Sequence, residues 1–236
     1  MANPYHEVKT VADLAREPAE YRAAISKIVV SHTVNELYGA QVFDEPAIAL
    51  APTPYAKWLT CRIAMEEYHH HVRFKGLADE LGIPQDATDP NVKQPLSIFG
   101  YPLKTWPEFC VIKMLADLAE ILQVEDLLHC SFVPLRNIGR ITMPEEKFHA
   151  QFGKDFCTEL CKTDLGRRDV QAAIDDYTPY LPKFFGAAGS KNNDLYRSYG
   201  LKERTNEQMR EDFLARARAV VESLGLRFPN PEAARA

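Results

Sequence analysis

Three pairs of glutamate and histidine lie three residues apart in this sequence, a spacing that suits a bound metal ion. The pairs are Glu66 with His69, Glu67 with His70, and Glu146 with His149. On a helix, residues three apart share one face, so a carboxylate and an imidazole can bind the same ion. Chance would place roughly half of one such pair in a chain of this composition. Three pairs therefore indicate a metal site.

The apolar pattern of the surrounding helix separates the two overlapping pairs. Apolar residues recur on one face, at Leu59, Ile63, Phe74, Leu77 and Leu81. Glu67 and His70 fill the gap in that stripe, and they need a metal or another partner because unpaired buried charge is very costly. Glu66 and His69 fall on the adjacent charged face beside Arg62, and we predict that they face solvent.

Two further helices carry polar residues on an apolar face. Glu146 and His149 lie in line with Phe156, on the inward face of their helix. A similar line in the first long helix contains His32 and Glu36. Taken alone, Glu36 has about even odds of being a surface glutamate at the edge of its stripe. His32 is either a group beside the metal or a satisfied core histidine.

The third long helix is apolar almost all round and is interrupted by Asp117 and Glu120, either of which could be a metal ligand or a structural hydrogen-bonding group. The order of the carboxylates then repeats. Glu36 precedes Glu67 by 31 residues, and Asp117 precedes Glu146 by 29. Half a helix, a short turn and half a helix occupy about that length, so two helical hairpins would deliver their ligands at one height.

The periodicity is helical nearly throughout, and it predicts an all-α fold. We expect helices near residues 18–43, 54–82, 106–134, 143–163, 167–180 and 205–225. The irregular stretch 82–107 suits a crossover between two hairpins of a four-helix bundle, with accessory helices at the C-terminal end. Pro144 predicts a break or kink just before the Glu146 motif, because proline fits the first turn of a helix better than its interior.

The rest of the chain suggests one domain, residues 1–236. Within it we expect a short N-terminal arm at about 1–17, a flexible surface loop at 186–194 and a frayed tail at about 228–236. Four carboxylates and two imidazoles can then meet in the centre of the bundle. That is the ligand set of a carboxylate-bridged di-iron or di-manganese site in a ferritin-like four-helix bundle, and it suits dioxygen binding better than a closed zinc site.

Composition excludes some other classes of protein. The net charge of -5 argues against a nucleic-acid partner. No segment approaches the roughly 20 apolar residues of a membrane span, and no leader pattern is present, so we expect a cytoplasmic protein with no membrane partner. The 5 cysteines are scattered and form no Cys-x-x-Cys pair, and we interpret them as reduced core residues.

From about Tyr21 to Pro229 the chain resembles the phenylacetic-acid-catabolism family of ferritin-like proteins. The similarity is carried by the stretches YRAAI, HTVNELYG, APT, EEYHH, ADELG, SIFGYP, PEEKFH and RTNEQMREDF. Within that family the chain resembles the catalytic A-type chains, which are found in ring epoxidases acting on phenylacetyl-CoA. The resemblance implies six metal ligands: Glu36, Glu67, His70, Asp117, Glu146 and His149. It favours Asp117 over Glu120 as the ligand from the third helix, and it leaves His32 and Glu120 as neighbouring or proton-relay groups.

The resemblance also implies a function. It suggests two iron ions, with di-manganese or mixed manganese and iron also compatible, that activate dioxygen. One oxygen atom would enter an aromatic acyl-CoA thioester or a related small organic acid derivative, in an epoxidase or monooxygenase reaction. Electrons would come from an external reductase, and the chain would form a homo- or hetero-oligomer with a ferritin-like subunit.

Two alternative functions use the same residues. A ferroxidase or metal-storage protein needs the six ligands but no organic substrate, and a noncatalytic ferritin-like subunit of an oxygenase complex needs neither. This sequence also departs from the family around its motifs. Tyr68, His69, His71, Leu118 and Glu120 stand where the family has small residues. We therefore predict that these side chains reshape the substrate pocket.

Overall fold

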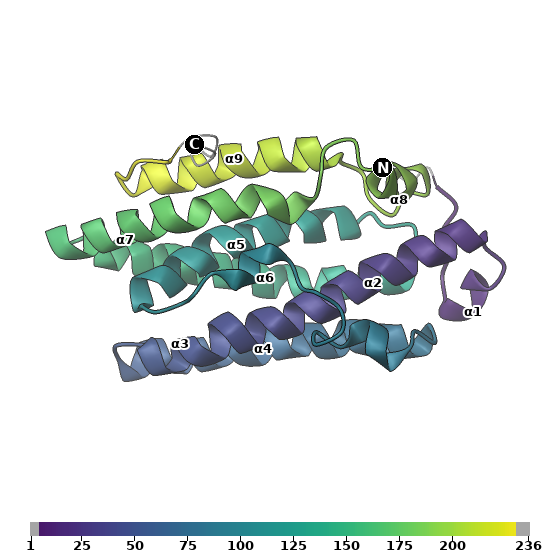
Figure 1. The fold of residues 1–236 in the computed structure, drawn as a ribbon, viewed down its shortest axis with the longest axis horizontal. Coiled ribbons are helices and arrows are strands. Elements are labelled where there is room, and N and C mark those ends of the chain that lie inside the picture. The colour runs from purple at the N-terminus through teal and green to yellow at the C-terminus, as the bar shows by residue number, and fades with distance from the viewer. Residues whose placement is uncertain (1–4, 230–236) are drawn as a thin grey trace.

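Four long helices form a bundle, which confirms the all-α, ferritin-like prediction (Figure 1). The computed structural model describes residues 5–229. The bundle helices are α2 (Ala19–Gly39), α4 (Pro54–Glu80), α5 (Trp106–Leu127) and α6 (Val133–Leu160). The remaining helical segments are α1 (Val11–Leu14), η1 (Ala40–Asp44), α3 (Glu45–Leu50), η2 (Gln85–Thr88), η3 (Ser97–Gly100), α7 (Asp164–Tyr177), η4 (Thr178–Phe185), α8 (Lys191–Ser198) and α9 (Asn206–Ser223).

The bundle consists of two packed pairs. Helix α2 lies against α4, α5 lies against α6, and α4 also contacts α6 (Figure 1). Helices α7 and α9 cover the outer side of α5. This explains why α5 is apolar almost all round: Phe109, Leu115 and Leu122 are all fully buried.

Caps set the start of the helices that carry the ligands. The Thr53 hydroxyl accepts a hydrogen bond from the Ala56 amide at the start of α4. The Thr105 hydroxyl accepts one from the Glu108 amide, and the Glu108 carboxylate accepts one in return from the Thr105 amide. Such reciprocal caps satisfy amides that have no partner within the helix, and they fix the helix register.

The predicted break before Glu146 is wrong, because α6 runs without interruption from Val133 to Leu160 with Pro144 inside it. Proline removes one helical hydrogen bond, which would have gone to the carbonyl of Arg140 four residues earlier. Arg140 and Pro144 are both exposed, so water can take the place of the missing bond. The turn between the third and fourth helices lies instead between Leu127 and Val133.

Other boundaries also differ from the sequence prediction. The first long helix passes into the π-helical segment η1 and then into α3. The predicted loop 186–194 already contains the start of α8 at Lys191. In the expected N-terminal arm, Val8 pairs with Phe132. Phe228 of the expected tail is buried, and residues 1–4 and 230–236 lie outside the described part of the chain.

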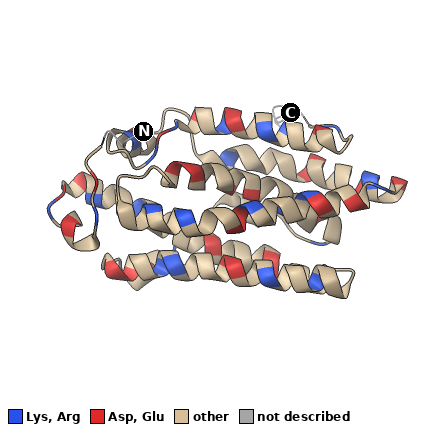
Figure 2. Cartoon of the chain, turned by 180° about the vertical axis from the view of Figure 1, so that it is seen from behind, with Lys and Arg blue, Asp and Glu red and all other residues tan. Residues whose placement is uncertain are grey.

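Surface charge, membrane-spanning helices and cysteine exposure can each be compared with the sequence analysis. Figure 2 shows lysines and arginines interspersed with acidic residues along the helices. None of the helices within residues 5–229 is long and apolar enough to cross a membrane. All five cysteines are free, and four are buried as predicted, but Cys61 is exposed.

Candidate metal centre

All six predicted ligands meet in the middle of the bundle, where they form two groups of four. One group is Glu36, Glu67, His70 and Glu146, and the other is Glu67, Asp117, Glu146 and His149. Within each group the candidate ligand atoms lie within 4.8 Å of one another, and every member is buried. Glu67 and Glu146 belong to both groups, so each could bridge two ions.

Both imidazoles turn Nδ1 toward the centre. Nδ1 of His70 lies 3.1 Å from Glu146 Oε1, 3.3 Å from Glu67 Oε2 and 3.7 Å from Glu36 Oε2. Nδ1 of His149 lies 3.1 Å from Glu67 Oε1 and 4.0 Å from Asp117 Oδ2. The carboxylates therefore surround two nitrogen atoms that could each bind one ion.

Buried atoms without hydrogen bonds show that this arrangement fits metal ions. Among the described residues, His70 Nδ1, His149 Nδ1, Asp117 Oδ2 and Glu146 Oε1 are buried and have no hydrogen-bonding partner. Leaving several such atoms unsatisfied in one place is unfavourable. Two divalent cations would supply their missing partner, and their four positive charges would balance the four carboxylates.

Each imidazole is oriented from the helix opposite its own. Nε2 of His70 on α4 lies 3.0 Å from Oε2 of Glu145 on α6, and Arg73 donates to the same carboxylate. Nε2 of His149 on α6 lies 2.9 Å from Oε2 of Glu66 on α4. If each Nε2–H donates to its carboxylate, the Nδ1 lone pair is left free for a metal.

The prediction that Glu66 faces solvent is therefore wrong, because its side chain contacts His149 and is only 7% exposed. His69 is exposed as predicted. Arg62 donates to Oε1 of Glu66 at 2.8 Å. Although burial raises the pKa of Glu66, the hydrogen bonds from His149 and Arg62 bring it below its usual value. The sequence signal for this contact was the Glu-Glu doublet in both motifs. The first glutamate of each doublet contacts the imidazole on the opposite helix.

A buried lysine beside the ligands was missed at the sequence level. Lys113 on α5 is 3% exposed, and its Nζ lies 2.7 Å from Glu67 Oε1, 3.1 Å from Asp117 Oδ2 and 3.1 Å from Asp44 Oδ1. Burial lowers the pKa of Lys113, but Asp117, Asp44 and Glu67 outweigh it and hold the pKa well above its usual value. In the metal-free protein these carboxylates therefore favour the charged form of Lys113.

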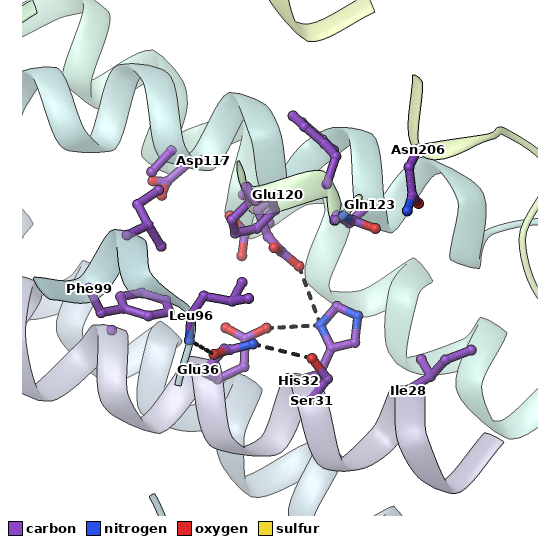
Figure 3. Close-up of a pocket in the computed structure, with 18 of the residues that line it drawn as sticks. Ile28, Ser31, His32, Glu36, Leu96, Phe99, Asp117, Glu120, Gln123 and Asn206 are labelled. Atoms are coloured by element: carbon purple, nitrogen blue, oxygen red, sulfur yellow. Dashed lines mark hydrogen bonds and ion pairs between the residues drawn. The ribbon is translucent and has the colours of Figure 1, made fainter. Parts of the chain in front are cut away.

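His32 and Glu120 lie next to the ligands on the other side. Nδ1 of His32 is 3.5 Å from Oε1 of Glu36 and 3.5 Å from Oε1 of Glu120 (Figure 3). The His32 ring stacks on Phe74 with a centroid distance of 4.6 Å. Burial, together with the nearby charges of Glu36 and Glu146, raises the pKa of Glu120 well above its usual value. His32 thus links a ligand to a carboxyl group that can hold a proton.

A cavity of about 310 Å³ opens onto this centre. Glu36, Asp117 and Glu120 line it, together with apolar residues of α2, η3 and η4 (Figure 3). The prediction that neighbouring bulky residues reshape the pocket is wrong for four of the five, since Tyr68, His69, His71 and Leu118 do not line the cavity. Tyr68 instead donates a hydrogen bond to Glu45, and His71 contacts the Thr33 carbonyl.

Comparisons with known proteins show the family of the chain and a related fold. Residues 8–236 match a family described as phenylacetic acid catabolic protein. The chain is 27% identical over 223 residues to the A subunit of 1,2-phenylacetyl-CoA epoxidase from Escherichia coli (strain K12), in a match that covers 91% of this chain and 72% of the relative. A solved structure of a Synechococcus protein with aldehyde deformylating oxidase activity shares the fold, with a TM-score of 0.68 and 19% identity. That match covers 93% of this chain and 98% of the other.

Proposed function

The chain belongs to the phenylacetic acid catabolic protein family, and on that basis we propose that it is a di-iron oxygenase. The observation that carries the proposal is the pair of four-residue groups that share Glu67 and Glu146, with unsatisfied atoms facing inward. In the proposed reaction, an organic substrate gains one atom of dioxygen. The other atom becomes water with two electrons, which an external reductase must supply, and two protons from solvent.

Iron, when bound, would supply the redox chemistry that dioxygen activation requires. The protein residues have other tasks. Glu145 and Glu66 orient the two imidazoles, and Lys113 balances the charge of Asp117 and Asp44. His32 and Glu120 can hold and pass a proton between the cavity and Glu36 Oε1, over contacts of 3.5 Å.

An acyl-CoA thioester or a related small organic acid derivative is the proposed substrate, with epoxidation of an aromatic ring as the first reaction to test. The support is the likeness to the 1,2-phenylacetyl-CoA epoxidase chain of Escherichia coli. A ferroxidase or storage protein would use the same ligands. The cavity favours an oxygenase, because it gives an organic molecule access to the ligands between apolar walls.

Partner chains are also part of the proposal, since the relative is one subunit of its enzyme. Along the outer face of α4, four large apolar side chains are exposed: Tyr55, Trp58, Met65 and Val72. Such a face supports association with a second ferritin-like subunit. Light scattering should show that the purified chain self-associates and that Met65→Asp weakens the association. A single-chain mass at every concentration would exclude a homo-oligomer.

Dioxygen consumption tests the proposed function. Protein loaded anaerobically with ferrous iron is supplied with a chemical reductant, and candidate thioesters and acids are added in turn. We expect dioxygen uptake coupled to a product that is heavier by one oxygen atom in mass spectrometry. Iron uptake far beyond two ions per chain, with no organic product, would contradict the proposal and favour storage.

A further inference from the structure

The cavity beside the metal centre is lined by carboxylates together with Lys113 at the ligands, and by two further lysines. Its six acidic lining residues are the metal-centre carboxylates and their neighbours: Glu36, Asp44, Glu67, Asp117, Glu120 and Glu146. The end beside Gln123 and Asn206 carries Lys202, which donates a hydrogen bond to Gln123, and Lys27 also lines the cavity. Figure 3 shows Asp117 toward one side of the cavity and Gln123 and Asn206 toward the other. Apolar side chains line the cavity as well: Phe99 lies on the side of Asp117, Ile28 on the side of Asn206, and Leu96 between them.

The two lysines at this end are not paired with acids. Lys27 donates to Oδ1 of Asn192 at 3.1 Å, and Lys202 donates to Oε1 of Gln123. Within residues 5–229, neither ammonium group has a carboxylate oxygen within 4.0 Å. Burial lowers the pKa of Lys202, which the more distant Asp126 and Glu120 offset only in part. Lys27 is exposed and Lys202 is partly buried, and a bound anion would give each ammonium group a charged partner in addition to its amide oxygen.

Two helices begin at the same end of the cavity. Helix α8 starts after Ser190, and α9 starts at Asn206; both residues line the cavity. The first turn of a helix carries a partial positive charge and amides without partners inside the helix. Ser190 and Thr205 cap these two starts, and each first turn carries an acidic residue, so the case for a negative group rests on Lys27 and Lys202.

The helices also give the length of the space between the two ends. Gln123 follows Asp117 by six residues on α5, which corresponds to about 9 Å along the helix. Lys27 precedes Glu36 by nine residues on α2, which corresponds to about 13 Å. At about 310 Å³, the cavity is at the small end of the range for organic ligands, so a whole coenzyme A cannot be enclosed in it.

We propose that the cavity binds a small organic acid, with its carboxylate between Lys27 and Lys202 and its apolar body directed at the metal ligands. The length corresponds to about eight carbon atoms. The inference rests on the proposed function, because it names the substrate class of that oxygenase. It selects a free acid in preference to a coenzyme A thioester, whose neutral acyl end would leave the two ammonium groups unpaired.

Calorimetric titration of the iron-loaded protein under anaerobic conditions tests the proposal. The probes are octanoate, the neutral octanamide of the same shape, and octanoyl-CoA. We expect octanoate to bind at least about tenfold more tightly than the other two probes. Lys202→Met and Lys27→Met should each remove most of that preference, while octanamide binding stays the same. Lys57→Met, at an exposed position on α4 away from the cavity, is the matched control.

Three results would overturn the proposal: equal binding of octanoate and octanamide, tighter binding of octanoyl-CoA, or no binding of any probe by correctly folded protein. Circular dichroism and iron content are measured on every sample. If iron and dioxygen uptake persist but binding does not depend on the lysines, the proposed function stands and this inference fails. If octanoate binding depends on the lysines but the protein takes up no iron, the acid-binding site stands and the proposed oxygenase function fails.

Discussion

In the half of the centre built by α2 and α4, the carboxylate of Glu36 faces the imidazole of His32 and the cavity. In the half built by α5 and α6, the carboxylate of Asp117 faces the ammonium group of Lys113. Both halves supply one unshared carboxylate, one imidazole and one bridging glutamate. The two halves differ in the group that lies beside the unshared carboxylate when no metal is bound.

That difference lies in the neighbours of the two unshared carboxylates. Lys113 lies beside both Asp117 and Asp44, so its ammonium group pairs with a carboxylate outside the ligand set as well as with a ligand. His32 lies 3.5 Å from both Glu36 and Glu120, and Glu120, whose pKa is raised by burial, lines the cavity. Asp117 therefore has a cationic neighbour and Glu36 has an imidazole neighbour, while both carboxylates line the cavity.

The largest expected effect comes from removing a ligand that both halves share. Glu146→Ala should abolish iron binding and dioxygen consumption, because both four-residue groups lose a member. Glu36→Ala should remove only one group and leave about one iron per chain. Elemental analysis measures both, with circular dichroism as the check on helicity. Full iron content in Glu146→Ala would show that the assigned bridging ligand is wrong.

A second prediction concerns the fixed cation. Lys113→Met should destabilise the metal-free protein by about 3 kcal/mol, because it leaves buried carboxylates without their positive partner. The loss should be smaller after metal loading, since the ions supply positive charge nearby. Denaturant unfolding with and without metal measures both values. Lys147→Met, at an exposed position of α6, is the matched control.

The double variant Lys113→Met with Asp44→Asn sharpens this test. Removing one buried carboxylate together with the ammonium should recover part of the lost stability of the metal-free protein. If Lys113→Met is as stable as the control variant, or if Asp44→Asn worsens it, Lys113 has no compensating role in this half of the centre.

The sequence could predict those features that depend on one helix alone, such as which side chains face the core. Glu67 and His70 lie on the apolar stripe of α4, so their inward direction follows from periodicity. The ferritin-like bundle follows from helix lengths and from the long crossover. Glu66 could not be placed in this way, because its burial depends on His149, which belongs to another helix. The same holds for Lys113, whose partners Asp44 and Glu67 come from two other segments.

Proton release on metal binding gives a third prediction. Contacts with Glu66 and Glu67 outweigh burial and raise the pKa of His149 from 6.5 to about 10 in the metal-free protein. The bound proton must leave before the imidazole ring can bind metal, so affinity for cobalt(II) should rise about tenfold per pH unit for each proton released. Anaerobic titrations at neighbouring pH values measure this. Affinity that does not change with pH would contradict a protonated His149.

The same pKa fixes the sign of a stability effect. A raised pKa means that the folded, metal-free protein holds the His149 proton more tightly than the unfolded chain does. The resulting stabilisation is fully present below about pH 6.5 and is lost as the pH rises to about 10. In His149→Ala, this part of the pH dependence of unfolding should disappear.

The smallest expected effect concerns a difference between the two ligand helices. Met65 precedes the Glu66-Glu67 doublet of α4, and Pro144 occupies the same position before the doublet of α6. Pro144→Met would restore the missing amide inside a continuous helix, and we expect stabilisation of about 1 to 2 kcal/mol with unchanged iron content. Thermal unfolding measures the change. A loss of iron would show that the proline positions the ligands.

The most direct test of the account is the number of metal ions per chain, measured by elemental analysis on protein from iron-replete cells purified without chelators or an affinity tag. The account predicts about two irons per chain, because two groups of ligands share Glu67 and Glu146. If no metal is bound, even after anaerobic reconstitution with ferrous iron, the six residues and Lys113 form a buried polar network, and the metal centre is refuted.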